Sequence, residues 1–132
     1  SRRVLKALGG YVADTLREAG ARLDVPEGGF YVMPDFNALA PRLAQRHIGD
    51  SPALTEAILQ DTGVAFLPGV CFGRTASEFT ARLSYVDFDG AAALEKVLHI
   101  EASTPILLET LRTVCGRTMT AIDRIAEWCD AL

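Results

Sequence analysis

Arg82 is the side chain whose type and position best suit a chemical role. It lies in a segment, residues 79–86, in which apolar and polar residues alternate, and side chains on a strand point to opposite faces with period two. Arg82 therefore shares one face with two hydroxyl residues, Thr80 and Ser84. A planar guanidinium between hydroxyls suits a carboxylate, because it donates two parallel charge-assisted hydrogen bonds. The same pattern is also that of the solvated face of an ordinary strand.

Other reactive residue types do not form a recognisable catalytic or metal-binding set. Cys71 is a candidate nucleophile, but no histidine lies near it in the sequence, and His47 and His99 are each isolated. The glycine-containing loop at residues 69–73 lacks the lysine and the strand-to-helix context of a phosphate-binding loop. Arg82 is therefore the main candidate for a functional residue in this sequence.

Composition limits the class of protein. With 132 residues, 49% hydrophobic and 23% charged, the chain suits one well-packed globular domain. No apolar run approaches the roughly 20 residues of a membrane-spanning helix. A net charge of −4 argues against a nucleic-acid surface, which needs clustered Lys and Arg. The three cysteines are odd in number, which predicts reduced thiols in a cytoplasmic protein.

The N-terminal part predicts one helix and two short strands. Apolar residues recur at three- and four-residue spacing over residues 2–19, which predicts an amphipathic helix with Gly20 as its C-cap. Strands are expected at residues 22–25 and 29–33, on either side of a tight turn. The chain starts at Ser1 inside a helical pattern and without a methionine, which suggests a piece of a longer or processed protein.

The middle part predicts a capped helix followed by a buried strand. A short helix is expected within residues 37–48. Ser51 followed by Pro52 is a typical helix start, with the hydroxyl as N-cap, and Gly63 is the expected end. The β-branched and aromatic run at residues 64–67 predicts a buried strand.

The C-terminal part predicts helices. One is expected from Asp89 to about residue 100, and a longer one opens at residues 103–105, with a possible break at Gly116. Trp128 is expected to pack this last helix. Its predicted apolar stripe consists of Leu107, Leu111, Val114, Ile122, Ile125 and Cys129.

Together these elements predict an α+β fold in a single domain, residues 1–132. Two pairs of strands are separated and followed by helices, so we expect a small, mostly antiparallel sheet with helices packed on one face.

Three segments of the chain carry a resemblance to a known family. They read PEGGFYVMPDF at residues 26–36, GVAFLPGVCFG at 63–73 and ARLSYVDFDG at 81–90. In this order and at this spacing, joined by a helix, they resemble the small C-terminal domain of fold-type I pyridoxal phosphate aminotransferases of class I/II. The resemblance covers residues 2–90, and the tail from Ala91 is longer than the single closing helix usual in that family.

The resemblance implies roles for particular residues. Arg82 matches the arginine of the R-x-S strand, which in the family binds the α-carboxylate of the amino acid or 2-oxo acid. Gly29 and Phe30 match a segment that forms a wall of the substrate pocket. The loop at residues 68–73 matches the P-G-x-x-F-G loop, which shapes the domain near that pocket.

The resemblance also implies what this chain does not contain. The family's cofactor lysine and phosphate-binding residues belong to a large domain, and Lys6 and Lys96 do not lie in its motif. We therefore expect pyridoxal phosphate to be held by a domain absent from this sequence, and this chain alone to be inactive. The full-length protein is expected to be a cytoplasmic, homodimeric aminotransferase of aspartate or aromatic type that acts on an amino acid and a 2-oxo acid.

Two alternatives remain open at the level of sequence. The first is another protein of the same fold, such as a carbon–sulfur lyase, an aminocyclopropane-carboxylate-type synthase or a regulator with an aminotransferase-like domain, since these share the carboxylate-binding arginine. The second is a free-standing α+β module that binds a small acid or a partner helix.

Overall fold

The computed structural model describes residues 2–23, 31–84 and 107–132. The expected helix from Asp89, the tight turn expected between the first two strands, and the proposed pocket residues Gly29 and Phe30 lie outside these ranges. None of the described helices is both long and apolar enough to cross a membrane. In chain order the elements are α1 (Arg2–Glu18), β1 (Tyr31–Val32), the 3-10 helix η1 (Asn37–Leu39), α2 (Ala40–Gln45), α3 (Ser51–Thr62), β2 (Leu67–Pro68), the 3-10 helix η2 (Gly69–Phe72), β3 (Ala81–Ser84) and α5 (Leu108–Asp130).

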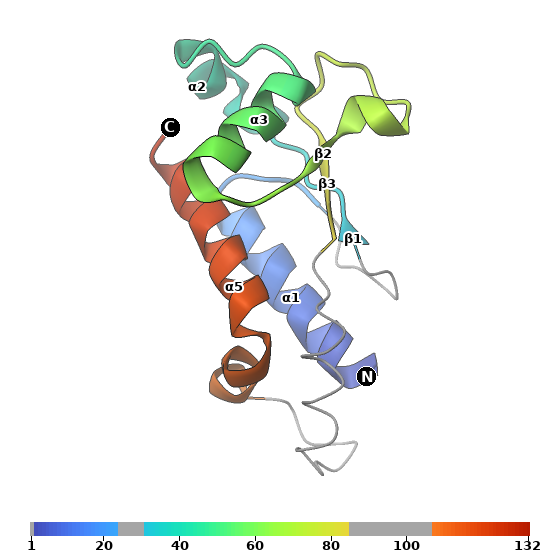
Figure 1. Ribbon diagram of the computed structural model, residues 1–132, viewed down its shortest axis with the longest axis vertical. Helices are drawn as coiled ribbons and strands as arrows, with labels where there is room; N and C mark the ends of the chain where they lie inside the picture. Colours follow the sequence, from blue (N-terminus) through green and yellow to red (C-terminus); the bar gives the residue numbers. More distant parts are fainter. Residues whose placement is uncertain (1, 24–30, 85–106) are drawn as a thin grey trace.

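The described strands form a small antiparallel sheet of order β1-β3-β2, with β3 in the middle (Figure 1). Tyr31 pairs with Ser84, and Leu67 pairs with Arg82. Paired residues lie on the same face of a sheet, and successive residues alternate between faces. We call the face that carries the side chains of Tyr31, Leu67, Arg82 and Ser84 the open face.

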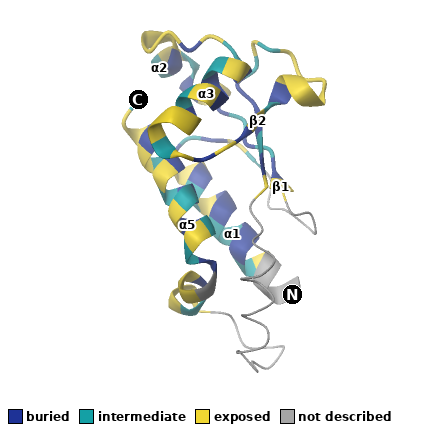
Figure 2. Ribbon diagram, in the orientation of Figure 1, coloured by how far each residue is buried: buried dark blue, intermediate teal, exposed yellow. Residues whose placement is uncertain are grey.

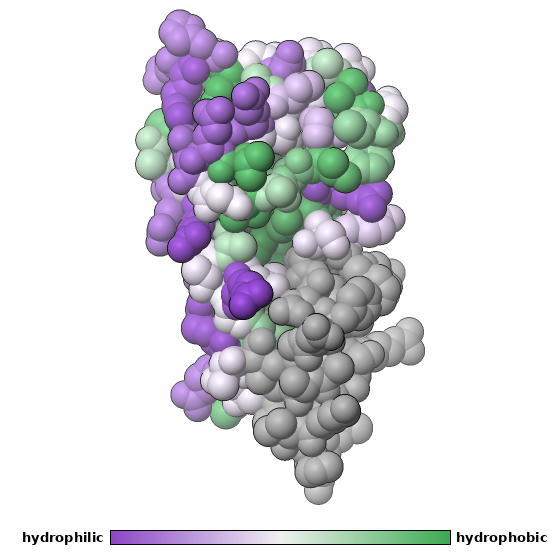
Figure 3. All heavy atoms as spheres, in the orientation of Figure 1, coloured by the Kyte–Doolittle hydropathy of each residue, from purple (hydrophilic) through white to green (hydrophobic). Residues whose placement is uncertain are grey.

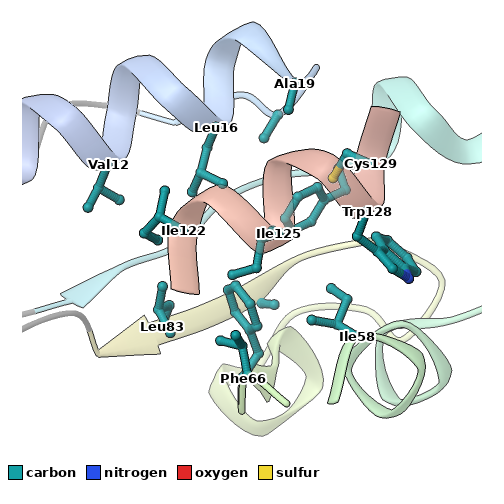
Figure 4. Packing of buried hydrophobic residues seen from close by; sticks show 14 of the residues in the cluster. Val12, Leu16, Ala19, Ile58, Phe66, Leu83, Ile122, Ile125, Trp128 and Cys129 are labelled. Atoms are coloured by element: carbon teal, nitrogen blue, oxygen red, sulfur yellow. The ribbon is translucent and has the colours of Figure 1, made fainter. Parts of the chain in front are cut away.

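The opposite face of the sheet is buried against helices, as the sequence predicts. Ala81, Leu83 and Val32 belong to this face, and all three are buried. Figure 4 shows Ile122 and Ile125 of α5 between the side chains of α1 and Leu83 of β3. In Figure 2 the buried residues of α1 and α5 form stripes along both helices. The predicted α+β arrangement, with helices on one face of the sheet, is therefore confirmed.

The C-terminal end of α1 follows the sequence prediction closely. Gly20 has a φ of +107°, a conformation that glycine adopts without steric cost. Its N–H donates to the Arg17 carbonyl, and the N–H of Ala21 donates to the Leu16 carbonyl at 3.0 Å. These two bonds form a Schellman motif, which satisfies carbonyls that a helix end otherwise leaves unpaired.

The start of α3 differs from the prediction by one residue. Asp50 is the N-cap, because its backbone is extended and its carboxylate accepts the N–H of Ala53 at 2.8 Å. Ser51, the predicted cap, is instead buried in the first turn, and its N–H donates to the Ala76 carbonyl at 2.8 Å. A contact distant in sequence therefore decides which of two good capping residues is used. The predicted end at Gly63 is confirmed by its left-handed backbone.

Strand boundaries are the least accurate predictions. The expected strand at residues 64–67 is wrong in position, since only Leu67–Pro68 forms a ladder, although Val64 and Phe66 are buried. The expected strand at residues 79–86 is shorter and comprises Ala81–Ser84. In place of a strand starting at residue 22, Arg22 forms an isolated bridge with Asp35.

The last helix, α5, is predicted well in its C-terminal half. Leu111, Ile122, Ile125 and Cys129 are buried, whereas Leu107 is 61% exposed and does not belong to the buried stripe. A non-helical residue, Cys115, interrupts α5 next to Gly116, close to the expected break. Trp128 is buried, and its Nε1 donates to Asp61 at 2.7 Å, so it packs this helix as expected.

Candidate functional site

Arg82 lies at the centre of the open face, between two aromatic rings. Its guanidinium carbon is 4.5 Å from the ring centroid of Tyr31 and 4.6 Å from that of Phe72. Tyr31 belongs to β1 and Phe72 to η2, which directly follows β2, so the two rings come from opposite sides of β3. Both contacts are within the range of cation–π interactions.

Arg82 also differs from three other arginines in its charge partners. Arg46, Arg74 and Arg112 form ion pairs with carboxylates at 2.7 to 3.1 Å. Within residues 2–23, 31–84 and 107–132, no carboxylate pairs with Arg82. Because stacking against rings does not use the N–H groups at the edge of a guanidinium, these donors remain available to an anion.

The two hydroxyls predicted beside Arg82 differ in exposure. Ser84 is exposed on the open face. Thr80 is 4% exposed and packs against Gly69, where an added Cβ would lie 1.9 Å from Thr80 Oγ1. Thr80 lies two residues before Arg82, just outside β3, and its hydroxyl is buried against Gly69 of η2, whereas Ser84 is exposed.

The loop at residues 68–73 brings Phe72 to Arg82. The N–H of Gly69 donates to the Thr80 carbonyl at 2.8 Å, which fixes the start of η2 beside β3. Gly73 ends the turn with a φ of +79°. The backbone approach at Gly69 and the left-handed turn at Gly73 each suit glycine. The loop is thus a structural one that presents an aromatic ring to the guanidinium.

Tyr31 and Phe72 were not singled out as ring partners of Arg82 by the sequence analysis. Tyr31 lies inside a predicted strand and Phe72 inside the P-G-x-x-F-G loop, so each had been assigned only to an element. The signal that identifies Tyr31 is its pairing with Ser84, which places it on the same face as Arg82. That register exists only in the folded sheet and cannot be predicted from the sequence of either strand alone.

Apolar side chains are exposed around the guanidinium. Tyr31 is 48% exposed and Phe72 37% exposed, and Leu67 and Val70 are exposed as well. Figure 3 shows apolar side chains gathered over η2, whereas the side of the molecule formed by α2 is hydrophilic. A cation set in apolar surface is partly shielded from water, which strengthens its attraction for an anion.

The remaining candidates contribute less. Cys71 is exposed in η2, and His47 is exposed after α2. In the described part of the chain, acidic, histidine and cysteine residues form no cluster that could hold a metal ion. A hollow lined in part by Arg17 and Asp35 lies apart from Arg82, and Arg17 is already engaged there with the Leu23 carbonyl.

Comparisons with known proteins agree with the resemblance seen in the sequence. Over 60 residues the chain is 45% identical to the probable aspartate/prephenate aminotransferase of Aquifex aeolicus. The aligned region is 46% of this chain and 13% of that protein. Over 81 residues it is 36% identical to the aspartate/prephenate aminotransferase of Cereibacter sphaeroides. This aligned region is 59% of this chain and 20% of that protein. No family model matches the chain.

A solved structure supports the same conclusion. An aminotransferase from Mycobacterium tuberculosis has a TM-score of 0.52 and 27% sequence identity, over 93% of this chain and 23% of that chain. The matches to all three proteins therefore span less than a quarter of their length. The resemblance to aminotransferases is confirmed, and the sequence and fold of this chain are consistent with a fragment of an aminotransferase.

Proposed function

We propose that this chain is the small C-terminal domain of a pyridoxal phosphate-dependent aminotransferase, in which Arg82 binds the α-carboxylate of the substrate. The observation that supports this most directly is the guanidinium of Arg82, which lies on the open face with aromatic neighbours and no carboxylate partner among the described residues. The similarity to aspartate/prephenate aminotransferases supports the reaction class.

The chemistry of the arginine fits an amino acid and a 2-oxo acid equally well. Both substrates of an aminotransferase carry a carboxylate next to the carbon that exchanges the amino group. A guanidinium binds this group through two parallel N–H···O bonds, each contributing about 1.5 to 3 kcal/mol when charged. Such a pair also fixes the plane of the carboxylate, and therefore the orientation of the reacting carbon.

We further propose that the amino-group donor or acceptor is aspartate or an aromatic acid, as the resemblance implies, or prephenate, which the names of the two relatives print beside aspartate. The role of Arg82 does not depend on this choice, since it concerns the carboxylate common to all these substrates. Gly29 and Phe30 remain proposed pocket residues on the strength of the resemblance alone.

The residues of this chain do not fit the cofactor. Its two lysines are Lys6 and Lys96; Lys6 is exposed on α1, and Lys96 lies outside the described ranges. Neither lies in a motif that binds pyridoxal phosphate. The site of pyridoxal phosphate would lie in the part of the relatives that this chain does not match. On the same resemblance, we propose that the full-length enzyme is homodimeric and cytoplasmic.

The test is the Arg82→Ala substitution in the full-length protein that contains this chain. Transfer of the amino group from aspartate to a 2-oxo acid is measured, and kcat/KM should fall roughly 10²- to 10⁴-fold because two charged hydrogen bonds are lost. Arg74→Ala is the matched control, since Arg74 is an exposed arginine of the same region that is paired with Glu78. Unchanged KM and kcat in Arg82→Ala would remove the proposed role.

The same assay addresses the alternatives. A lyase or synthase of this fold would consume the amino acid without a matching 2-oxo acid, and a regulator or a free-standing acid-binding module would show no exchange. An exchange that depends on both substrates, with the loss in Arg82→Ala described above, is the expected result.

A further inference from the structure

The guanidinium of Arg82 is held by rings rather than by an acid. Arg46 lies 5.4 Å from the ring centroid of Trp128 and Arg112 lies 5.5 Å from that of Tyr11, but each of these arginines is also tied to a carboxylate. Arg82 is closer to its rings, has two of them, and has no carboxylate in the described part of the chain.

This arrangement solves a problem that any carboxylate-binding arginine faces. A long, flexible side chain must be ordered before it can accept a ligand in one geometry, and that ordering opposes binding. An acidic partner would order the guanidinium but would also occupy its donors and neutralise its charge. Aromatic rings order it and leave the donors at its edge and its positive charge in place.

The two rings are supplied independently of each other. Tyr31 comes from β1, which pairs with β3, and Phe72 comes from η2, which is fixed to β3 through the Gly69 N–H and the Thr80 carbonyl. In the sheet order β1-β3-β2, β1 pairs with one edge of β3, and η2 follows β2 on the other edge. The position of the guanidinium therefore depends on both neighbours of the central strand.

We propose that Tyr31 and Phe72 are positioning residues that hold the Arg82 guanidinium, with its edge free, for the carboxylate of the substrate. This inference rests on the proposed function. In this proposal the two rings affect substrate affinity through Arg82. They do not contact the reacting atoms.

The experiment uses the full-length protein and succinate, a dicarboxylate without an amino or oxo group. Succinate binding is measured by calorimetry, and kcat and KM for aspartate are measured in parallel. Tyr31→Leu and Phe72→Leu should each raise the Kd for succinate roughly two- to fivefold, as expected for the loss of one cation–π contact. KM should rise by a similar factor with a smaller change in kcat, since the carboxylate is bound in the ground state too.

Two kinds of control separate positioning from mere structural support. Tyr31→Phe and Phe72→Tyr keep a ring beside the guanidinium and should leave the Kd within about twofold of the wild-type value. Leu59→Ala removes another exposed apolar side chain, on α3, and should have no effect on the Kd. If the ring-retaining variants lose as much affinity as the leucine variants, the proposal is wrong.

A double-mutant cycle provides the decisive result. In an Arg82→Ala background, adding Tyr31→Leu or Phe72→Leu should not lower kcat/KM for aspartate any further, because the rings act only through Arg82. A further loss of the same size in that background would show a structural role and overturn the inference. Melting temperatures of all variants are compared so that unfolding is recognised.

The cycle also separates this inference from the proposed function. If Arg82→Ala loses affinity but the ring variants bind succinate like the wild type, the positioning role alone is refuted. If Arg82→Ala itself binds succinate like the wild type, the proposed carboxylate site is refuted, and the positioning role with it.

Discussion

The open face of the sheet and the interface between α1 and α5 each contain an arginine beside a tyrosine ring, and the two arginines are partnered differently. At the interface, Arg112 donates to the hydroxyl of Tyr11 at 2.7 Å and to Asp123 Oδ2 at 3.1 Å. The Tyr11 hydroxyl in turn donates to Asp123. On the open face, Arg82 has rings as neighbours and no acid in the described ranges.

This difference indicates that the charges of Arg112 and Arg82 have different roles. One donor of Arg112 joins α5 to Tyr11 of α1, and another pairs with Asp123 of α5, so its charge is balanced within the chain. The donors of Arg82 are not used in this way, although the side chain is half-buried and held in place. An ordered cation without an acidic partner is costly to maintain for stability alone, and it is therefore the better indicator of a binding site.

The largest effect that tests this comparison is expected from replacing each arginine by lysine. Arg82→Lys keeps the charge but loses the planar fork, so kcat/KM of the full-length protein should fall roughly 10- to 100-fold, the equivalent of one charged hydrogen bond. Arg112→Lys should leave kcat/KM unchanged. Equal losses in steady-state assays of the two variants would mean that the two regions do not differ in function.

A second effect concerns the scaffold of the open face. In Gly69→Ala the added Cβ would lie 1.9 Å from Thr80 Oγ1 and 3.1 Å from the Thr80 carbonyl oxygen, so the buried Thr80 side chain or the backbone beside it must shift. We expect a loss of about 1 to 3 kcal/mol in the free energy of unfolding, as is typical of overpacking. Chemical denaturation measures it.

Gly49→Ala is the matched control for this substitution, because an added Cβ at Gly49 meets no atom within 4 Å. Its free energy of unfolding should stay within about 0.5 kcal/mol of the wild-type value. If both alanine variants are equally stable, the close approach of Gly69 to Thr80 is not needed to hold η2 beside β3.

Local patterns predicted the elements that depend on nearby residues. The end of α1 at Gly20 and the end of α3 at Gly63 follow from the φ angles that glycine permits. The period-two alternation also predicted that Arg82 and Leu83 lie on opposite faces of a strand, and Leu83 is buried. These features are encoded within a few residues of where they occur.

Features that depend on distant contacts were missed. Nothing near Tyr31 in the sequence indicates that it pairs with Ser84 and so lies beside Arg82. Asp50 and Ser51 are equally good N-caps, and the bond from Ser51 N–H to the Ala76 carbonyl decides between them. The ring pair around Arg82 could therefore not be derived from periodicity, because it exists only once the register of three strands is fixed.

A third, smaller effect tests the interface side of the comparison. Burial and the hydrogen bond to Asp123 raise the pKa of Tyr11 above its ordinary value of about 10. The folded protein thus holds the phenol proton more tightly than the unfolded chain. The stability that Tyr11 contributes is fully present below pH 10 and is lost as the pH rises through the folded pKa.

Tyr11→Phe isolates this contribution. At pH 8 the variant should be less stable by about 1 kcal/mol, the net value of a typical hydrogen bond. The difference from the wild type should shrink as the pH is raised above 10, because the wild type alone loses the contribution of the Tyr11 proton. Urea unfolding between pH 8 and pH 11 measures both values, and a difference that stays constant with pH would contradict the assignment.

The smallest expected effect on stability comes from thiol alkylation. This reaction compares how accessible the cysteines are beside the open face and in α5. Cys71 is exposed in η2 beside the open face, whereas Cys129 is buried in α5, where burial raises the pKa of its thiol to about 12. Since the thiolate is the reactive form, iodoacetamide at pH 8 should modify Cys71 in the folded chain and Cys129 only after unfolding.

Mass spectrometry of the 132-residue chain with and without urea distinguishes these cases, and alkylation of Cys71 should leave the melting temperature unchanged. Equal modification of Cys71 and Cys129 without urea would mean that α5 opens readily from the core. The hydrogen bond from Arg112 of α5 to Tyr11 of α1 would then be transient. Arg112 would no longer be an arginine whose donors are held by the fold, and its contrast with Arg82 would not stand.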